Sequence, residues 1–357
     1  MSTTALALPS TEEEIWRYSR IDELDLGAFR LGTTRTVVEH ADEVQLTGRE
    51  AQTSLGIAMS SAADVFAQLN TDNAAPIVLR VGRNVVVPRT VVITHHLNES
   101  GIVAYPRLVI DAGENSEITV IERFVSADDV VSLIVPVVEL RAAQAARVTY
   151  MAINELGRRT WQIGHQQAVG ERDSTTRLFS VALGGDYARV RAEVRLVGQG
   201  ASAQQTALYF ADSDQMHDFR TWQVHDAPRT HSDLLFKGAV KDTAKSVYTG
   251  LIKIGEHAAG SQAFQTNRNL TLSHGAWAQS VPNLEIETND VKCSHASTIG
   301  PIDDDQRFYL ESRGVPPHIA ERLVVLGFFD EVINRLPESS FTEGLRAQVS
   351  AKLGSSR

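Results

Sequence analysis

Short runs that alternate apolar and polar residues dominate the middle of the chain. The run Ala188–Leu196 alternates apolar and charged positions without a break, which is typical of a strand with one buried face. Gly184-Gly185 and Gly198-Gln199-Gly200 bracket this run with residues that favour turns. Similar units recur between residues 96 and 300 without helical periodicity. The pattern therefore predicts a mainly β body, either a β-sandwich or a parallel β-solenoid.

The first 95 residues mix helix and strand signals, and we interpret residues 1–95 as a small α/β cap. A cap of this kind would cover the open edge of the body that follows. The expected elements are a short helix capped by Ser10 or Thr11, a helix over Ala62–Leu69 that stops in the turn Asn70–Asn73, and strands over Ile77–Val81 and Val85–Pro88.

Residues 301–357 predict a C-terminal helical region. Asp303 and its acidic neighbours suit a helix N-terminus, and Gly314 suits the end of that helix. Pro316-Pro317 opens a second helix, Pro337 ends it, and Glu338–Lys352 forms a third. The second helix carries an apolar face at Ile319, Leu323, Leu326, Phe329, Ile333 and Leu336.

Two adjacent phenylalanines complicate that second helix, because Phe328 and Phe329 do not point in the same direction on a helix. One alternative is that the helices pack wholly on the β body. The other is that part of the apolar face remains for the groove of a partner.

Composition narrows the class of protein. The net charge of −10 argues against nucleic acid and anionic membrane surfaces as partners. No apolar run approaches the ~18 residues of a membrane span. The N-terminus has no basic region followed by a long apolar run, and a single cysteine suits a reducing compartment. We expect a soluble cytoplasmic protein.

The only cysteine lies two residues from a histidine, in the sequence Cys293-Ser294-His295. On a strand, this spacing puts the thiol and the imidazole on the same face. The pair could hold a soft metal or provide a thiolate nucleophile, although a lone cysteine is commonly a small buried apolar residue. Nucleotide-binding and hydrolase motifs are absent, so any ATP chemistry belongs to a partner.

Several segments around this pair resemble one protein family. They are Pro282–Ile286, Asp290–Gly300 and Phe308–Val315, with further agreement in His225–Gly238 and Gln265–Ser273. Together these segments resemble the SufB/SufD family, the scaffold subunits of the Suf iron–sulfur cluster assembly machine, and the SufD type in particular. The resemblance implies a right-handed parallel β-helix, which decides between the two architectures left open above. We expect His225, Pro228, Thr230 and Ser232 to be architectural, and His95, His96, His217 and His274 to be ordinary histidines.

Two departures separate this chain from the SufB type. Leu270–Ser273 follows Arg268-Asn269 without the thiol that SufB carries there, and Ser294 and Ala296 replace the acidic neighbours of the matching histidine. The chain is therefore not expected to be the primary sulfur acceptor. The resemblance implies instead that Cys293 and His295 face a SufB-type subunit and hold iron or a nascent cluster transiently. No stably bound cofactor is expected, and the involvement of a flavin is left open.

The resemblance also implies that the C-terminal helices dock a SufC-type ABC ATPase, with this chain acting as a non-catalytic scaffold. The expected docking residues are Phe308, Tyr309, Ile319, Leu323, Leu326, Phe328, Phe329 and Ile333. A heterodimer with SufB through the edges of the two β-helices is the preferred assembly. The alternatives are a SufB-like homodimer and, much less favoured, a carbohydrate-active β-helix enzyme.

Overall fold

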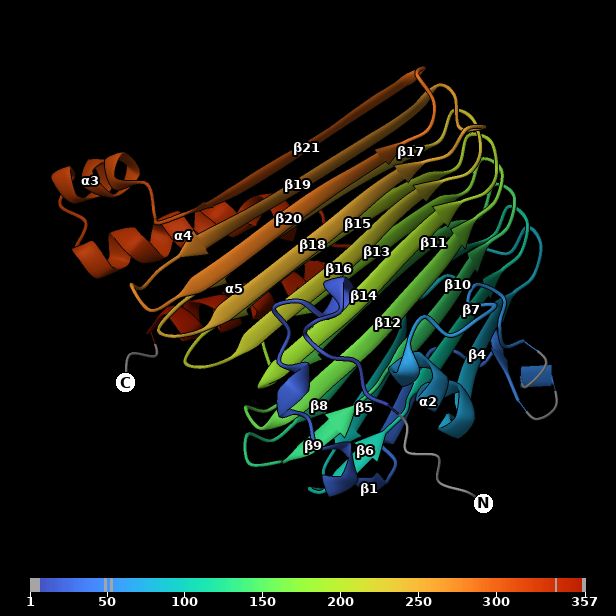
Figure 1. The fold of residues 1–357 in the computed structure, drawn as a ribbon, viewed down its shortest axis with the longest axis horizontal. Coiled ribbons are helices and arrows are strands. Elements are labelled where there is room, and N and C mark those ends of the chain that lie inside the picture. Colours follow the sequence, from blue (N-terminus) through green and yellow to red (C-terminus); the bar gives the residue numbers. More distant parts are fainter. Residues whose placement is uncertain (1–6, 48–49, 52–53, 338, 355–357) are drawn as a thin grey trace.

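The body of the protein is a stack of coils whose consecutive strands alternate between two sheets (Figure 1). This computed structural model describes residues 7–47, 50–51, 54–337 and 339–354. Nearly all strand pairs are parallel, and among the described pairings only the two short strands that open the sheets pair antiparallel. The architecture is therefore a parallel β-helix, with helices at its C-terminal end.

The strands follow one another in a simple order along each sheet. The first sheet runs β20 (Trp277–Ile286), β18 (Lys245–Ile254), β16 (Met216–His225), β14 (Tyr187–Leu196), β12 (Thr160–Gly170), β10 (Val137–Ala142), β7 (Arg107–Ala112), β4 (Pro76–Val81) and β3 (Gln45–Leu46), with β1 (Arg30–Leu31), β6 (Ile102–Ala104) and β9 (Ser132–Ile134) at its side. The second sheet runs β2 (Arg35–Glu39), β5 (Val91–Leu97), β8 (Glu117–Ser126), β11 (Arg147–Glu155), β13 (Thr175–Ala182), β15 (Ser202–Ala211), β17 (His231–Val240), β19 (Ser261–Thr271) and β21 (Val291–Gly300).

Each coil adds a long strand to each sheet, and two coils add a short second strand, β6 or β9, to the first sheet, so that residues of successive coils stack in columns. Val148 lies opposite Ile118, and Ala263 lies opposite Ser232. Stacked partners are 26 to 32 positions apart in sequence, and alternate residues of every strand point into the interior. The core is therefore a series of inward-facing columns.

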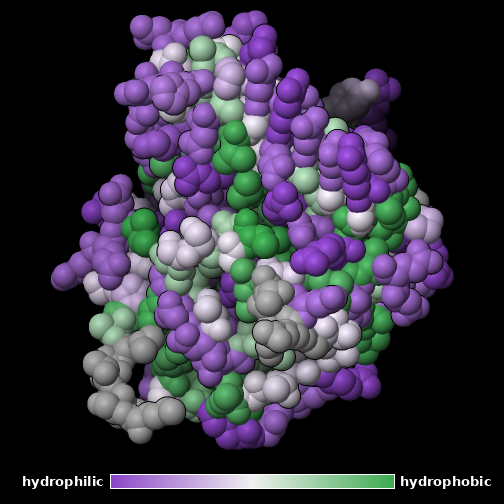
Figure 2. All heavy atoms as spheres, turned by 90° about the vertical axis from the view of Figure 1, so that its right-hand side faces the viewer, coloured by the Kyte–Doolittle hydropathy of each residue, from purple (hydrophilic) through white to green (hydrophobic). Residues whose placement is uncertain are grey.

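The corners between the sheets are built on residues with left-handed backbones. Asn115, Ala145 and Asp173 have φ values of 52°, 58° and 56°. Each donates its backbone N–H to a carbonyl of the next coil, as Asn115 does to Gln144 at 2.9 Å, and the ladder continues to the bond from Gly260 to Asp290 at 2.7 Å. The side of the molecule on which these corners stack is covered mostly by hydrophilic side chains (Figure 2).

The structure corrects the predicted start of the helix near residue 62. Helix α2 spans Val65–Asn73 and begins after Asp64, whose carboxylate accepts hydrogen bonds from the N–H groups of Phe66 and Ala67 at 3.0 Å. Asp64 also pairs with His165 at 2.9 Å, so a contact distant in sequence fixes the cap. The expected turn at Asn70–Asn73 is therefore part of the helix.

Two further predictions near the N-terminus were wrong. The segment after Ser10 and Thr11 forms only 3-10 turns, η1 (Glu14–Trp16), η2 (Ile21–Glu23) and η3 (Leu26–Ala28), and neither residue caps a helix. Val85–Pro88 is a connection with one isolated bridge at Val86, because Asn84 turns the chain with a φ of 60°. Strand Ile77–Val81 is confirmed within β4, and the parallel pairing of β4 with β7 carries the body back to Pro76.

The N-terminal segment is fixed to the outer face of the first sheet by two buried arginines. Arg189 lies 3.9 Å from the centre of the Trp16 ring and donates to the carbonyl of Ile15 at 2.6 Å. Arg220 donates to the carbonyl of Arg17 at 2.6 Å. Asp218 pairs with both guanidinium groups. Burial alone would raise the pKa of Asp218, but the two positive charges outweigh it and lower that pKa.

Three helices complete the chain: α3 (Asp304–Ser312), α4 (Pro317–Ile333) and α5 (Ser339–Gly354). The carboxylate of Asp303 caps α3, and Gly314 ends it with a φ of 85°, as predicted. None of the described helices has both the length and the apolar character to span a membrane.

Helix α4 packs across β15 and β17 of the second sheet. It buries Phe329 and Ile333 against Phe210 and Leu235. Lys237 of β17 donates to the carbonyl of Phe328 at 2.8 Å and pairs with Glu331 at 2.6 Å. Apolar and polar contacts therefore both attach α4 to the β-helix.

Candidate functional site

The C-terminal end of the β-helix is open. Strands β20 and β21 are the last members of their sheets, and in Figure 1 the edge of β21 faces away from the rest of the body. Leu284 and Ile286 stack on the fully buried Ile252 and Ile254 but are themselves 40% and 43% exposed. The last inward-facing layer of the β-helix thus meets solvent. Terminal coils of solenoids normally need a polar cap, so an apolar open end indicates a surface that something covers.

Cys293 and His295 lie on this open layer. They stack on Ala263 and Gln265, both of which are buried, so they share the inward face of β21 as their spacing predicted. Cys293 is half-buried and packs beside Val291, Ile252 and Ile254, whereas His295 is exposed.

The chemistry of the pair is incomplete in this chain. Burial raises the pKa of the Cys293 thiol, so the thiol is neutral near pH 7. Metal sites normally take three or four ligands, and nowhere in the part of the chain that the structure describes do three His, Cys, Asp or Glu side chains gather for a metal. Cys293 and His295 are two side chains where a tetrahedral metal site has four ligands, so a metal bound at this pair would need ligands from outside the described residues.

Three of the four residues expected to be architectural, His225, Thr230 and Ser232, are deeply buried and bonded to one another, and Pro228 is half-buried. The His225 ring bonds to the hydroxyls of Thr230 at 2.7 Å and Ser232 at 2.8 Å. Burial lowers the pKa of His225 to about 4, so its imidazole is neutral. These contacts confirm the architectural interpretation for His225, Thr230 and Ser232. The other histidine of β16 has the same character: His217 is fully buried, burial lowers its pKa to about 3, and its Nε2 contacts the Gly184 carbonyl at 3.1 Å.

The asparagine-rich segment of β19 also has a structural role. Asn267 donates to the Tyr209 hydroxyl at 2.9 Å, that hydroxyl donates to Asn269 at 2.7 Å, and Asn269 donates back to Asn267 at 2.8 Å. The Tyr209 ring reaches Asn269 across Gly238, where a Cβ would lie 1.9 Å from the ring. Only glycine leaves room for this closed ring of hydrogen bonds.

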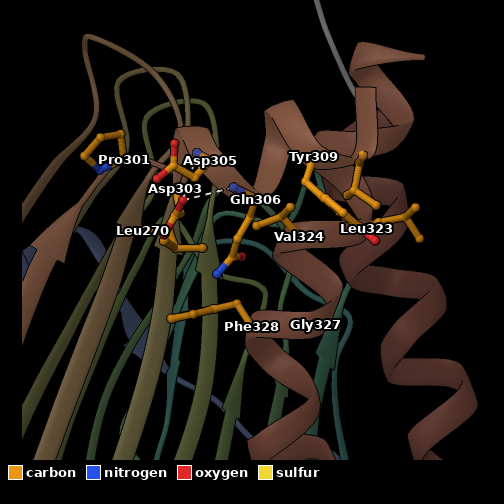
Figure 3. Close-up of a pocket in the computed structure, with 11 residues that line it drawn as sticks. Leu270, Pro301, Asp303, Asp305, Gln306, Tyr309, Leu323, Val324, Gly327 and Phe328 are labelled. Carbon is orange, nitrogen blue, oxygen red and sulfur yellow. Dashed lines mark hydrogen bonds between the residues drawn. The ribbon is translucent and has the colours of Figure 1, made fainter. Parts of the chain in front are cut away.

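A second candidate surface is a groove of about 820 Å³ between α3, α4 and the end of β19 (Figure 3). Tyr309 and Leu323 lie close together on one wall, and Phe328 and Gly327 form the floor. The other wall carries Leu270, Pro301, Asp303, Asp305 and Gln306. The groove is mainly apolar with an acidic rim, which suits the docking of another protein surface.

The structure divides the expected docking residues into two groups. Phe308, Tyr309 and Leu323 are 70%, 59% and 46% exposed, and they are available to a partner. Phe329 and Ile333 are fully buried against the β-helix, so they hold α4 in place. The half-buried residues between these groups are Ile319, Leu326 and Phe328. Phe328 stacks its edge on Phe329 and lies 4.7 Å below the ammonium of Lys237.

Some residues of both surfaces escaped the sequence analysis. Leu284 and Ile286 lie in a segment that the sequence analysis used only for the family resemblance, and their exposure follows from their place in the last described coil. Leu270 and Val324 join the groove because the end of β19 and the middle of α4 line the same cavity. The signal that would have found the open end is a strand with apolar residues at its inward-facing positions that no further strand of the repeat follows.

Comparison with known proteins gives a consistent result. Residues 95–328 match the family described as SUF system FeS cluster assembly, SufBD core domain. A Mycobacterium tuberculosis protein named as an iron–sulfur cluster assembly SufBD family protein is 35% identical over 366 residues, which cover 98% of this chain and 90% of that protein.

Proteins named SufD are also similar. The iron–sulfur cluster assembly protein SufD of Escherichia coli is 32% identical over 70% of this chain and 58% of its own length. The SufD protein of Bacillus subtilis is 30% identical over 76% of this chain and 62% of its own length. The matched region includes the strands that form the open end and most of α4.

Proposed function

This chain belongs to the SufBD family of iron–sulfur cluster assembly proteins, and on this basis we propose that it is a SufD-type scaffold subunit. It pairs with a SufB-type subunit through the open end of its β-helix and docks a SufC-type ABC ATPase in the groove between α3 and α4. The chain itself is a non-catalytic cytoplasmic component, and iron or a nascent cluster is its transient cargo.

The observation that carries the proposal is the open end of the β-helix. Leu284 and Ile286 expose inward-facing apolar surface beside two unpaired strand edges. A second β-helix with a similar end would bury this surface and satisfy the unpaired backbone groups. The pairing would also bring new side chains to Cys293 and His295, which on their own make up half of a ligand set.

The state of the Cys293 thiol fits a site that is assembled only in the complex. A neutral thiol is a poor nucleophile and a poor ligand, so the raised pKa protects Cys293 in the free chain. A metal cation or a positive group on the partner would favour the thiolate and release its proton to solvent. The His295 imidazole would supply the second ligand from the same strand.

The SufD type is supported by two features of the chain. No thiol follows Arg268-Asn269, and the residues that flank His295 are Ser294 and Ala296 instead of acidic side chains. The chain therefore lacks the groups that the resemblance associates with sulfur acceptance in SufB. Relatives named SufD agree with this assignment.

The attachment of α4 supports a mechanical role for the ATPase. Lys237 connects β17 to the Phe328 carbonyl and to Glu331, directly behind the groove. A partner that binds in the groove would therefore act on the β-helix through a rigid connection. ATP-driven association of two docked ATPases would then twist the scaffold and expose the site at the subunit interface.

The test is co-expression of the tagged chain with the SufB-type and SufC-type proteins of the same organism. Size exclusion with light scattering should give a complex of all three proteins. Deletion of 301–357 would uncover the apolar face of β15 and β17, so Phe308→Ala and Leu323→Ala are the better probes of the groove. Each should reduce ATPase binding and keep the SufB-type partner.

Cluster assembly tests the open end directly. His295→Ala should leave the complex intact and lower the cluster yield in reconstitution, while Ser297→Ala, two positions along the same face of β21, serves as the matched control. A monomer that binds neither partner would overturn the scaffold assignment. A homodimer that assembles clusters without a SufB-type partner would replace it by the SufB-like alternative.

A further inference from the structure

One buried side chain beneath the open end has no hydrogen-bond partner on either of its polar atoms. Gln265 is 2% exposed, and among the described residues neither its Nε2 nor its Oε1 has a partner. It stacks directly under His295 in the register of β19 and β21, so the two side chains occupy successive layers of one column. Neighbouring strands lie about 4.8 Å apart, which is within reach of a glutamine amide.

The space around the Gln265 amide is shaped to receive it. Across the interior, Gly250 faces the amide, and a Cβ at that position would lie 2.6 Å from its Nε2 and 2.4 Å from the Tyr248 hydroxyl. Tyr248 is already bonded to Thr221 at 2.9 Å. The backbone of β18 therefore makes room for the amide without giving it a bond.

An unpaired buried amide is costly, and packing alone does not require one here. A buried polar group without a partner destabilises the folded chain, because it loses its hydrogen bonds to water and gains none in exchange. In the coil beneath, the residue of the same column is Leu234, which is fully buried, and beneath that lies Gln205. A leucine therefore fits this column. It is similar in size to glutamine and has no polar group to leave unpaired, so packing alone does not explain why position 265 is a glutamine.

We propose that Gln265 is a positioning residue for His295, and this inference rests on the proposed function of the open end. When iron binds His295 through one ring nitrogen, the other ring N–H needs an acceptor, and ligating histidines commonly donate it to a carbonyl or carboxylate oxygen. Oε1 of Gln265 is an unused acceptor in the adjacent layer. Its bond would fix the tautomer and the orientation of the imidazole while iron or a nascent cluster is held.

The experiment compares variants in the complex with the SufB-type and SufC-type proteins, measuring the initial rate of cluster formation from ferrous iron and sulfide. Gln265→Leu should lower this rate by about 10-fold or more, the usual effect of losing such a partner. Gln265→Glu keeps the acceptor and should retain most of the rate. Gln205→Leu is the matched control, since Gln205 is equally buried in the same column with its Oε1 unpaired.

Stability separates positioning from a structural role. Because Gln265→Leu removes an unpaired amide, the unfolding midpoint of the chain should stay the same or rise while the rate falls. The double variant with His295→Ala should be no slower than His295→Ala alone, because Gln265 acts through the imidazole. A fall in both midpoint and rate, or an equal loss in Gln205→Leu, would assign Gln265 a structural role and overturn the inference.

The reference variant keeps the two proposals distinct. If His295→Ala has no effect on the rate, the proposed function of the open end fails. If His295→Ala slows the reaction and Gln265→Leu does not, the imidazole works without the Gln265 amide, and only the positioning role fails.

Discussion

Phe329→Ala tests whether α4 is held on the β-helix by its apolar face. Phe329 is fully buried, and its ring lies 6.4 Å from that of Phe210 in the cluster that joins α4 and α5 to the second sheet. Truncation of a buried phenylalanine costs about 3–5 kcal/mol through lost burial and the cavity that remains. The helices bind the sheet only from one side, so this loss should appear as local opening of α4 and α5.

Amide hydrogen exchange followed by mass spectrometry measures that opening. A loss of 3–5 kcal/mol corresponds to roughly a hundredfold to several thousandfold faster exchange across α4, since each 1.4 kcal/mol is a factor of ten. Strands β11 and β13 in the middle of the body should keep their protection. Leu323→Ala is the control, because its side chain is half exposed and faces the groove. Its exchange should change by less than about tenfold.

One result would refute the reasoning. If Phe329→Ala leaves the exchange of α4 unchanged, the polar contacts hold the helix without the apolar face. These contacts are the bonds of Lys237 and the pair between Arg335 and Asp233. The division of the predicted docking residues into exposed and anchoring groups would then lose its physical basis.

Three further predictions follow from individual contacts. His217 has a pKa of about 3 in the folded chain and about 6.5 in the unfolded chain. Its contribution to the free energy of unfolding is therefore complete above pH 6.5 and is lost as the pH falls toward 3, by up to about 1.4 kcal/mol per pH unit. Denaturant titrations at several pH values should show that His217→Gln removes this dependence on pH. Leu284→Asp should leave the circular dichroism of the free chain unchanged and abolish co-purification with the SufB-type subunit, and retention of that complex would exclude the open end as the interface. Gly238→Ala should lower the free energy of unfolding by about 1–3 kcal/mol because its Cβ would meet the Tyr209 ring, whereas Gly344→Ala in α5 meets nothing within 4 Å and should raise it by about 0.5–1 kcal/mol.

Much of the β-helix could be predicted, because alternation is a local property. Ala188–Leu196 lies within β14, which begins one residue earlier at Tyr187, and Ile77–Val81 lies within β4. The choice between sandwich and solenoid was beyond local pattern, since coil lengths vary by a few residues and hide the repeat. Likewise, the start of α2 depends on the pairing of Asp64 with His165, which is remote in sequence.

The candidate site was predicted only in part, for a similar reason. The shared face of Cys293 and His295 follows from their spacing, and the structure agrees. The burial that raises the pKa of Cys293, the exposure of Leu284 and the unpaired amide of Gln265 all depend on where the stack of coils ends. On α4, apolar residues lie on nearly all sides, so periodicity did not separate Phe329, which anchors the helix, from Leu323, which faces the groove.

The ladder of left-handed corners has a consequence for how the last coil behaves in time. Each corner N–H is held by the coil that follows it, and the last described rung is the bond from Gly260 to the Asp290 carbonyl. The final coil has neighbours on one side only, so in a nearest-neighbour stack it has about half the interface energy of an internal coil and frays first. A subunit that docks there acts as the missing coil and stops the fraying. The ordering of the strand that carries Cys293 and His295 and the formation of the interface would then be a single cooperative event.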